Sequence, residues 1–378
     1  MYHHRSEDMR ILFVRLTDGL SGSEYYNIYL LKELQKQQDI SVHLITNFQP
    51  FIQKIQREQI PCSYIHLPIK EIGTGRELLI GFRSFIPFLL SFLHTLRNLE
   101  SDKKFHAIIL ESTTEKIFLT LLLKLLHYRV VWIEHGPFFR TYRFFLVKWL
   151  YVLTSNYVHS IIVVSQDTKT DLVTHGIESK KVHCVYIGID IPRIRVSHKN
   201  TREGCFTIGF LGSITKEKGI KEFLDTAYAL LQKHAYASFC IIGDGPLLEW
   251  AKQYVRILKI QKNVLFTGHV DDISNYVQHI DTMYFPTRHL EGLSLAILES
   301  LAMGKIIVAR DIGGNRELVV NKKTGFLFQS DEEGQEILED ILNGKLSVKG
   351  IPEAAITHVR KHFLMENQVK EFMKVFHG

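Results

Sequence analysis

The sequence has little cysteine, and its cysteines follow no pattern that builds a metal site. Only four occur in 378 residues, and none stands in a C-x-x-C spacing. Scattered cysteines argue against zinc and favour buried, reduced thiols in a cytosolic protein. The four are Cys62, Cys184, Cys205 and Cys240.

We also expect no leader sequence, no membrane-spanning run and no internal repeat. The first eight residues are mostly polar and the apolar run after Met9 is short, so we expect no signal peptide. The most apolar stretch, residues 78–96, contains Arg83 and Pro87. An arginine near the bilayer centre would cost about 2.5–3.5 kcal/mol, so we expect buried or surface-lying helices there. No low-complexity tract and no repeat of solenoid period occurs.

The chain is long enough for two cores, and its composition is globular, with 46% apolar and 23% charged residues. Residues 10–46 read as strand, Gly/Ser turn, helix and strand, which is typical of a doubly wound α/β domain. Residues 207–233 repeat this opening. Residues 191–201, with Pro192 and several charges, form the expected linker. The sequence therefore predicts two α/β domains.

The stretch Pro286–Gly304 is the most informative part of the chain. It follows a strand expected at Thr282–Phe285, passes through a polar turn and enters a helix expected at Leu293–Met303. Glu291 and Glu299 would lie ~12 Å apart along a helix, too far for a glycosidase acid pair, which needs roughly 5–9.5 Å. They could hold the two ends of a polyhydroxylated ligand, or be solvated glutamates of an ordinary amphipathic helix. Backbone N–H groups at the expected helix start would suit a phosphate, namely those of Gly292, Leu293 and Ser294.

This stretch, with two glutamates flanking seven residues, resembles the signature of family 4 of the retaining glycosyltransferases. The resemblance implies the GT-B fold, in which two doubly wound, Rossmann-like domains face a cleft. It places Glu299 on the ribose of a sugar nucleotide and Glu291 near the transferred sugar. We therefore expect an N-terminal acceptor domain at 1–196, a C-terminal donor domain at 197–361, and a last helix at 362–378 that packs back on the first domain.

Other motifs extend the resemblance along the second domain. Lys218 follows a strand and would sit beside the diphosphate, where it would offset charge on the leaving group. The family usually has Arg at the position of Ser213, and Lys216 or Arg288 is the candidate replacement. Solvated lysines around a turn are the alternative. The resemblance also assigns the strand-end residues Gly212 and Gly243 to the donor site and places His269 by the nucleobase. After a strand expected at 305–309, the glycine pair at 313–314 would let backbone amides approach sugar hydroxyls or phosphate closely.

In the first domain, two strand-end turns are candidate ligand sites. Gly22 lies in a Gly/Ser turn that departs from the family's Gly-Gly pair by one serine, and it could approach a phosphate or simply permit a tight turn. His135 ends the strand expected at 130–134. A lone histidine is often structural, but the family keeps a His-Gly pair here beside the donor sugar.

Residues 138–151 combine seven aromatic residues with Arg140, Arg143 and Lys148. Between Lys116 and Leu150, six basic residues stand against a single acid, Glu134. Aromatics would suit a core helix, whereas interleaved cations suit an anionic membrane surface, and one segment could do both. We expect residues 138–151 to rest on the inner face of the plasma membrane.

These observations predict a retaining glycosyltransferase that moves a sugar from a nucleotide-sugar, UDP- or GDP-linked, to a glycan or lipid-linked acceptor. The family's usual setting is surface polysaccharide or glycolipid synthesis. Nothing suggests a cofactor or a nucleic-acid partner, and metal-independent chemistry is expected because no acidic pair is placed for a metal. Two alternatives stay open: a nucleotide-sugar epimerase of the same fold, and a GT-B module that binds a sugar nucleotide or glycan without catalysis.

Overall fold

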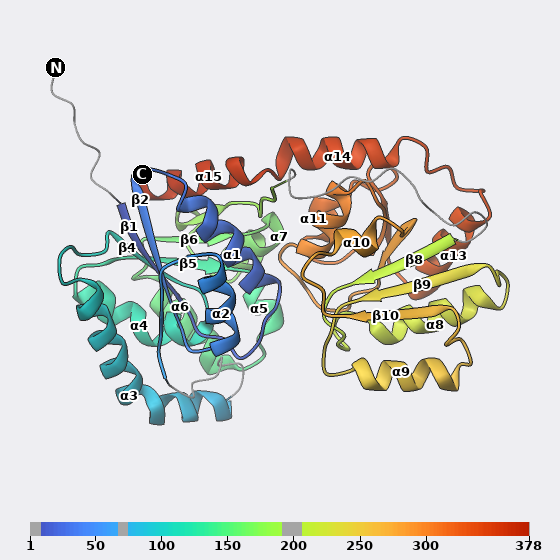
Figure 1. Cartoon of the computed structure of the whole chain (residues 1–378). Coiled ribbons are helices and arrows are strands. Elements are labelled where there is room, and N and C mark those ends of the chain that lie inside the picture. The colour runs from blue at the N-terminus through green and yellow to red at the C-terminus, as the bar shows by residue number, and fades with distance from the viewer. Residues whose placement is uncertain (1–8, 67–74, 191–205, 378) are drawn as a thin grey trace, which may run out of the picture. The chain divides into compact units, whose positions relative to one another are not determined.

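The computed structural model describes residues 9–66, 75–190 and 206–377 (Figure 1). The chain divides into two compact units: residues 1–187 with 365–378, and residues 188–364. The linker expected at 191–201 and the boundary expected at 196/197 lie outside the described residues. Among the described helices, none is both long and apolar enough to cross a membrane.

The first unit is built on a parallel sheet of seven described strands, in the order β3-β2-β1-β4-β5-β6-β7. The strands are β1 (Met9–Arg15), β2 (Ile40–Thr46), β3 (Cys62–Tyr64), β4 (Ala107–Leu110), β5 (Arg129–Glu134), β6 (Ser160–Val163) and β7 (Val182–Cys184). The helices are α1 (Gly22–Leu34), α2 (Gln49–Arg57), α3 (Gly75–Leu99), α4 (Thr113–Leu125), α5 (Phe138–Thr141), α6 (Phe145–Ser155), α7 (Gln166–Thr174) and α15 (Met365–His377), with a 3₁₀ turn at Ser179–Lys181.

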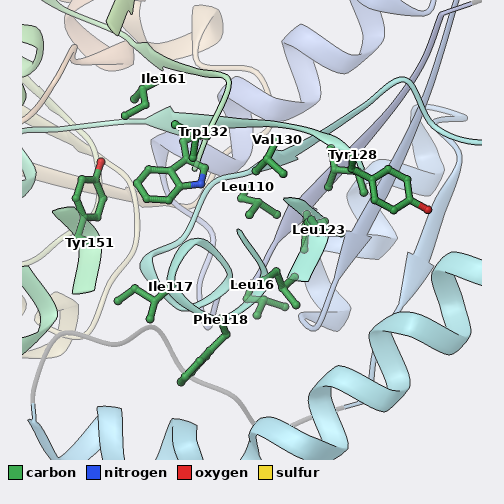
Figure 2. Packing of buried hydrophobic residues seen from close by; sticks show 14 of the residues in the cluster. Leu16, Leu110, Ile117, Phe118, Leu123, Tyr128, Val130, Trp132, Tyr151 and Ile161 are labelled. Carbon is green, nitrogen blue, oxygen red and sulfur yellow. The ribbon is translucent and has the colours of Figure 1, made fainter. Parts of the chain in front are cut away.

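Both faces of this sheet are covered, which explains why its central strands are almost wholly apolar. On one face Trp132 lies among Val130, Tyr151 and the α4 side chains (Figure 2), and its indole N–H donates to Thr120 Oγ1 at 2.9 Å. On the other face Phe13 stacks on Phe372 of α15, with ring centroids 6.2 Å apart. The last helix is therefore part of the core of the first unit.

The second unit has a parallel sheet of six described strands, in the order β10-β9-β8-β11-β12-β13. The strands are β8 (Phe206–Leu211), β9 (Ala237–Ile242), β10 (Val264–Gly268), β11 (Thr282–Phe285), β12 (Ile306–Arg310) and β13 (Phe326–Phe328). The helices are α8 (Ile220–Leu231), α9 (Leu248–Ile257), α10 (Ser274–Val277), α11 (Leu295–Ala302), α12 (Asn315–Leu318), α13 (Asp331–Leu342) and α14 (Ile351–His362).

Each sheet has one point at which the strand order reverses. In the first unit the chain runs outward from β1 to β3 and then restarts at β4 on the other side of β1. In the second unit the same reversal separates β8 from β11. Doubly wound sheets bind ligands outside the carboxyl ends of the strands at this switch point, because the flanking loops there diverge.

The sequence pattern predicts helices that start at Glu24 and at Leu293, and both start at other residues in the structure. Helix α1 starts at Gly22 rather than Glu24, because Glu24 accepts the Ser21 backbone N–H at 2.8 Å as in a capping box. Helix α11 starts at Leu295 rather than Leu293, with Ser294 as its extended N-cap residue.

Candidate functional site

At the switch point of the second unit, the loop after β8 is hydrogen-bonded to the loop after β11. The backbone N–H groups of Arg288 and His289 donate to Glu217 O at 2.8 and 3.2 Å. Gly219 has a φ of +79°, and a Cβ added there would lie 2.2 Å from Pro286 O. A glycine is therefore required for the two loops to approach so closely.

These two loops bring together Lys218 and Glu291, which the sequence assigns to the reaction. Lys218 Nζ lies 2.5 Å from Glu291 Oε1, and Thr287 Oγ1 donates to the same oxygen at 3.3 Å. Burial alone would raise the pKa of Glu291, but the charge and hydrogen bond of Lys218 outweigh it and lower that pKa. The pair thus places a carboxylate and an ammonium group at the switch point, both partly accessible.

The paired glycines after β12 lie against the main chain of the loop that carries Glu291. Sequence reasoning expects their amides to approach sugar hydroxyls or phosphate, but Gly314 N–H donates to Glu291 O at 3.0 Å. A Cβ added at Gly314 would lie 1.6 Å from Gly292 O, and one at Gly313 would lie 2.4 Å from Glu291 O. The glycine pair therefore holds the main chain of Glu291 and Gly292 in place.

The loops after β8 and β9 are joined in the same way. Ile214 N–H donates to Asp244 O at 2.9 Å, and a Cβ at Gly243 would lie 2.0 Å from Gly212 O. Gly212 itself has a φ of +143° and open space where a Cβ would stand. Ser213 follows it, half-buried, where the family usually has Arg.

Helix α11 begins beside this assembly. Its first backbone N–H groups belong to Leu295 and the residues after it, so Gly292 and Leu293 precede the helix instead of forming its first turn. Gly292, Leu293 and Ser294 are buried, and Glu299 lies half-buried one turn into the helix. The helix start thus lies two residues further along the chain than predicted, and the anion site at this helix start stays a prediction.

The side chains of two further predicted donor residues, Arg288 and His269, lie within ion-pair distance of other acidic residues. The Arg288 guanidinium is held by Glu222 at 2.5 Å and by Asp331 at 2.6 Å. His269 follows the end of β10, half exposed, with its Nε2 3.6 Å from Asp271. Arg288 is therefore already neutralised by two carboxylates, which favours Lys216, an exposed residue of the β8 loop, as the spare cation.

In the first unit, His135 contacts a buried carboxylate that sequence reasoning did not single out. His135 Nε2 lies 3.0 Å from Glu111 Oε2, and Asn27 Nδ2 donates to the same oxygen at 2.7 Å. The ring of Tyr26 meets the imidazole edge-on at 5.1 Å. Glu111 directly follows β4, so its position at a strand end beside β5 was the signal available in the sequence.

The Gly/Ser loop after β1 lies at the switch point of this sheet, next to the start of α4. Ser112 Oγ donates to Leu16 O, and Arg15 forms a buried ion pair with Glu24 at 2.8 Å. Burial would raise the pKa of Glu24, but Arg15 and Ser21 lower it overall. A Cβ at Gly22 would meet nothing within 4 Å, so neither packing nor backbone conformation demands glycine there.

Among the residues that the structure describes, no group of three or more His, Cys, Asp or Glu side chains is arranged to hold a metal ion. Charged residues at each switch point instead pair with one another, Arg15 with Glu24 in the first unit and Lys218 with Glu291 in the second.

Comparison with known proteins identifies the family. Residues 20–193 match the model of Glycosyltransferase Family 4, and residues 205–343 match that of Glycosyl transferases group 1. The chain belongs to these glycosyltransferases. Its fold is GT-B: HepE from Anabaena, solved in complex with UDP, superposes with a TM-score of 0.79 at 17% identity, covering 97% of this chain and 99% of that one.

The chain matches only part of the length of two curated relatives. The Vi polysaccharide biosynthesis protein VipC/TviE of Salmonella typhi is 25% identical over 52% of this chain and 37% of its own length. A UDP-Gal:alpha-D-GlcNAc-diphosphoundecaprenol alpha-1,3-galactosyltransferase of Escherichia coli is 23% identical over 49% of this chain and 51% of its own. The matched region thus spans well under two thirds of these relatives.

Proposed function

We propose that the protein transfers a sugar from a nucleotide-sugar to a hydroxyl group of a glycan or lipid-linked acceptor, with retention of anomeric configuration. The observation that carries this proposal is the Lys218–Glu291 pair across the β8/β11 switch point, beside the start of α11. A cation and a helix N-terminus at this position suit a diphosphate. Family membership supports the reaction class, and retention comes from the family resemblance.

In this proposal each group has a separate task. The bond between the anomeric carbon and the diphosphate oxygen breaks while Lys218 and the α11 amides stabilise the charge left on the diphosphate. The acceptor oxygen forms its bond to the same carbon, and its proton passes to the departing diphosphate. Glu291 holds hydroxyls of the transferred sugar and Glu299 holds the ribose. The family resemblance assigns His135 to the sugar as well.

The acceptor and its location are part of the proposal. A relative named for a diphosphoundecaprenol acceptor and another named for polysaccharide biosynthesis both favour a lipid-linked or growing glycan substrate. We place the reaction on the cytoplasmic side of the membrane, where such an acceptor meets soluble nucleotide-sugars. HepE binds UDP and UDP-glucose, which makes a UDP-sugar the first donor to test.

A panel of UDP- and GDP-sugars tests the function, with and without a lipid-linked glycan acceptor. Glycosyl transfer predicts nucleoside diphosphate release that depends on the acceptor, together with a glycosylated product. Release or a new free sugar without any acceptor would instead indicate an epimerase, and binding without turnover would indicate a non-catalytic module.

Lys218→Ala supplies the residue-level test. It should lower kcat by about 10²–10³-fold, because Lys218 acts on charge that develops in the transition state, while nucleotide affinity falls less. Lys221→Ala is the matched control, since Lys221 lies three residues further on and pairs with Asp225 at 2.5 Å on the helix surface. Equal turnover of Lys218→Ala and wild type would refute the assignment of this site.

A further inference from the structure

Helix α6 has two apolar faces, and only one of them is packed. Val147 and Tyr151 are fully buried against the first sheet. Phe145, Trp149 and Leu153, spaced by four residues, are 77%, 51% and 37% exposed. Residues at this spacing lie on one side of a helix, so they form an outward apolar stripe.

Helices α3 and α4 extend this stripe into a broader surface. Both pack against α6 and against each other on the same face of the sheet. Their outward side chains include Ile86 and Leu90 of α3 and Leu125 of α4, which are 66%, 63% and 76% exposed. We call the exposed faces of α3, α4 and α6 the three-helix surface. Exposed apolar side chains gathered on neighbouring helices often mark an interaction site.

From α4 to α6, the exposed charges that lack an ion-pair partner among the described residues are all positive. Of the six cations between Lys116 and Leu150, three are occupied within the first unit. Lys116 pairs with Glu134, Arg129 donates to main-chain carbonyls of α15, and Arg140 pairs with Asp167 and Asp171. The other three have no ion-pair partner among the described residues, and residues 138–157 contain no Asp or Glu. These three are Lys124, Arg143 and Lys148.

We infer that the three-helix surface docks on an anionic lipid bilayer, with Phe145 and Trp149 inserted at the headgroup level and the three free cations on the lipid phosphates. Aromatic side chains flanked by uncompensated lysine and arginine fit this interface because the rings partition there and the cations gain from its negative potential. Residues 138–141 take no part through their aromatics, since Phe138 and Phe139 are buried.

This inference deepens the proposed function. It rests on that function only for the purpose of docking, which is access to a lipid-linked acceptor. The surface itself can be tested without donor or acceptor. Failure of vesicle binding with intact glycosyl transfer would refute the docking surface alone, and vesicle binding without transfer would refute the proposed function alone.

Flotation of the full chain with two kinds of vesicle is the direct experiment. Vesicles of an equal mixture of phosphatidylcholine and phosphatidylglycerol should carry the protein upward, and phosphatidylcholine alone should not. Arg143→Gln with Lys148→Gln should weaken binding about fivefold for each charge removed. Phe145→Ser with Trp149→Ser should weaken it on the order of tenfold or more.

Matched control variants distinguish binding through the three-helix surface from non-specific adsorption to vesicles. Ile257→Ser and Lys262→Gln alter exposed side chains of the second unit, 74% exposed in the case of Ile257, and should bind vesicles as wild type does. A blue shift of tryptophan emission on adding anionic vesicles should disappear in Trp149→Ser. Protein that stays in solution, ignores lipid charge, or keeps its affinity in both double variants would overturn the inference, and a protein partner would then be the occupant to seek.

Discussion

Glu111 is a buried residue that contacts His135, the histidine proposed to act on the sugar. Its side chain is buried, and its Oε2 atom lies within hydrogen-bond distance of both His135 Nε2 and Asn27 Nδ2. A carboxylate only accepts hydrogen bonds, so this contact keeps the proton of a neutral imidazole on Nε2 and leaves Nδ1 as the acceptor nitrogen. Glu111 thus positions His135.

We predict that Glu111→Ala and His135→Ala lower turnover by a similar factor and that the double variant is no worse than either. Residues that act as one unit give such non-additive effects, whereas independent losses would multiply. The measurement is kcat and KM for all three variants with donor and acceptor saturating in turn. A structural role alone would lower the amount of folded enzyme and leave KM unchanged. Multiplicative losses in kcat would show that Glu111 does not act through His135.

Glu115 carries the clearest pH dependence among the described residues. It is completely buried, and burial raises its pKa to about 7, against the lowering effect of the Ser112 amide and of Arg15. Its Oε1 atom accepts backbone N–H groups of Glu111 and Ser112 at 3.2 and 2.5 Å. Between the ordinary glutamate pKa and about 7 the folded protein keeps a proton that the unfolded chain has lost.

It follows that Glu115 stabilises the fold fully below the unfolded pKa and that this contribution is lost as pH rises through about 7. Glu115→Gln can still accept both amides but does not ionise. We expect wild type and variant to have similar stability near about pH 5 and the variant to be more stable by on the order of 3 kcal/mol near about pH 8. Urea unfolding of the first unit across this range measures the difference. Glu353→Gln, at an exposed position of α14, is the control, and stability curves for Glu115→Gln that stay parallel to wild type would contradict the prediction.

At the scale of elements, the strand-end loops are held by close main-chain contacts that only glycine allows. A Cβ at Gly314 would overlap Gly292 O, whereas one at Gly22 would meet open space. Gly314→Ala must therefore push the Glu291 loop away and should cost about 1–3 kcal/mol in stability. Gly22→Ala, at the first residue of α1, should change stability by less than about 1 kcal/mol or raise it slightly. Thermal unfolding of both variants compares them, and equal destabilisation would show that the loops are not tightly coupled.

The same loops show which features could be predicted from the sequence. Strand β11 occupies Thr282–Phe285 as expected, because a buried apolar run ends at Pro286. The glycine pair at 313–314 signals a close approach, but the sequence does not say that the approaching group is the main chain of Glu291. The predicted start of α11 is two residues too early, because Ser294 has the extended backbone of an N-cap residue and the apolar pattern from Leu293 does not reveal this.

For the candidate site, the sequence likewise predicts positions along the chain better than it predicts side-chain contacts. The strand-end positions of Lys218, Glu291 and His135 could be predicted because each follows a strand in a recognisable motif, and their roles stay predictions. Their partners could not all be found, because the Glu111–His135 contact and the Arg288 ion pairs depend on side-chain orientation across elements distant in sequence. The same holds for the basic residues between 116 and 150. Their net charge can be counted in the sequence, but the buried ion pair of Lys116 with Glu134 cannot be predicted from it.

At the scale of the whole molecule, two units with separate cores and separate switch points should respond separately to ligands. The described residues proposed for donor binding, apart from Gly22, belong to the second unit, and the loops that carry them are joined to one another by main-chain hydrogen bonds. A nucleoside diphosphate without sugar or acceptor should therefore stabilise the second unit first. Binding at a hundredfold excess over Kd adds about 2.7 kcal/mol to the stability of the unit that binds.

Hydrogen–deuterium exchange with saturating UDP, and with GDP in parallel, tests this expectation. Protection should concentrate at residues 212–219, 243–247, 286–299 and 311–317, because these loops lose local opening when the ligand joins them. The loop at 17–23 and the turn at 135–137 should change less with the nucleotide alone and more with the full nucleotide-sugar, since His135 is proposed to act on the sugar. Glu299→Ala should reduce the protection caused by the nucleotide, whereas Glu353→Ala should not. Protection that appears first in the first unit would mean that the nucleotide binds there, and the roles proposed for Lys218 and Glu291 would fail with it.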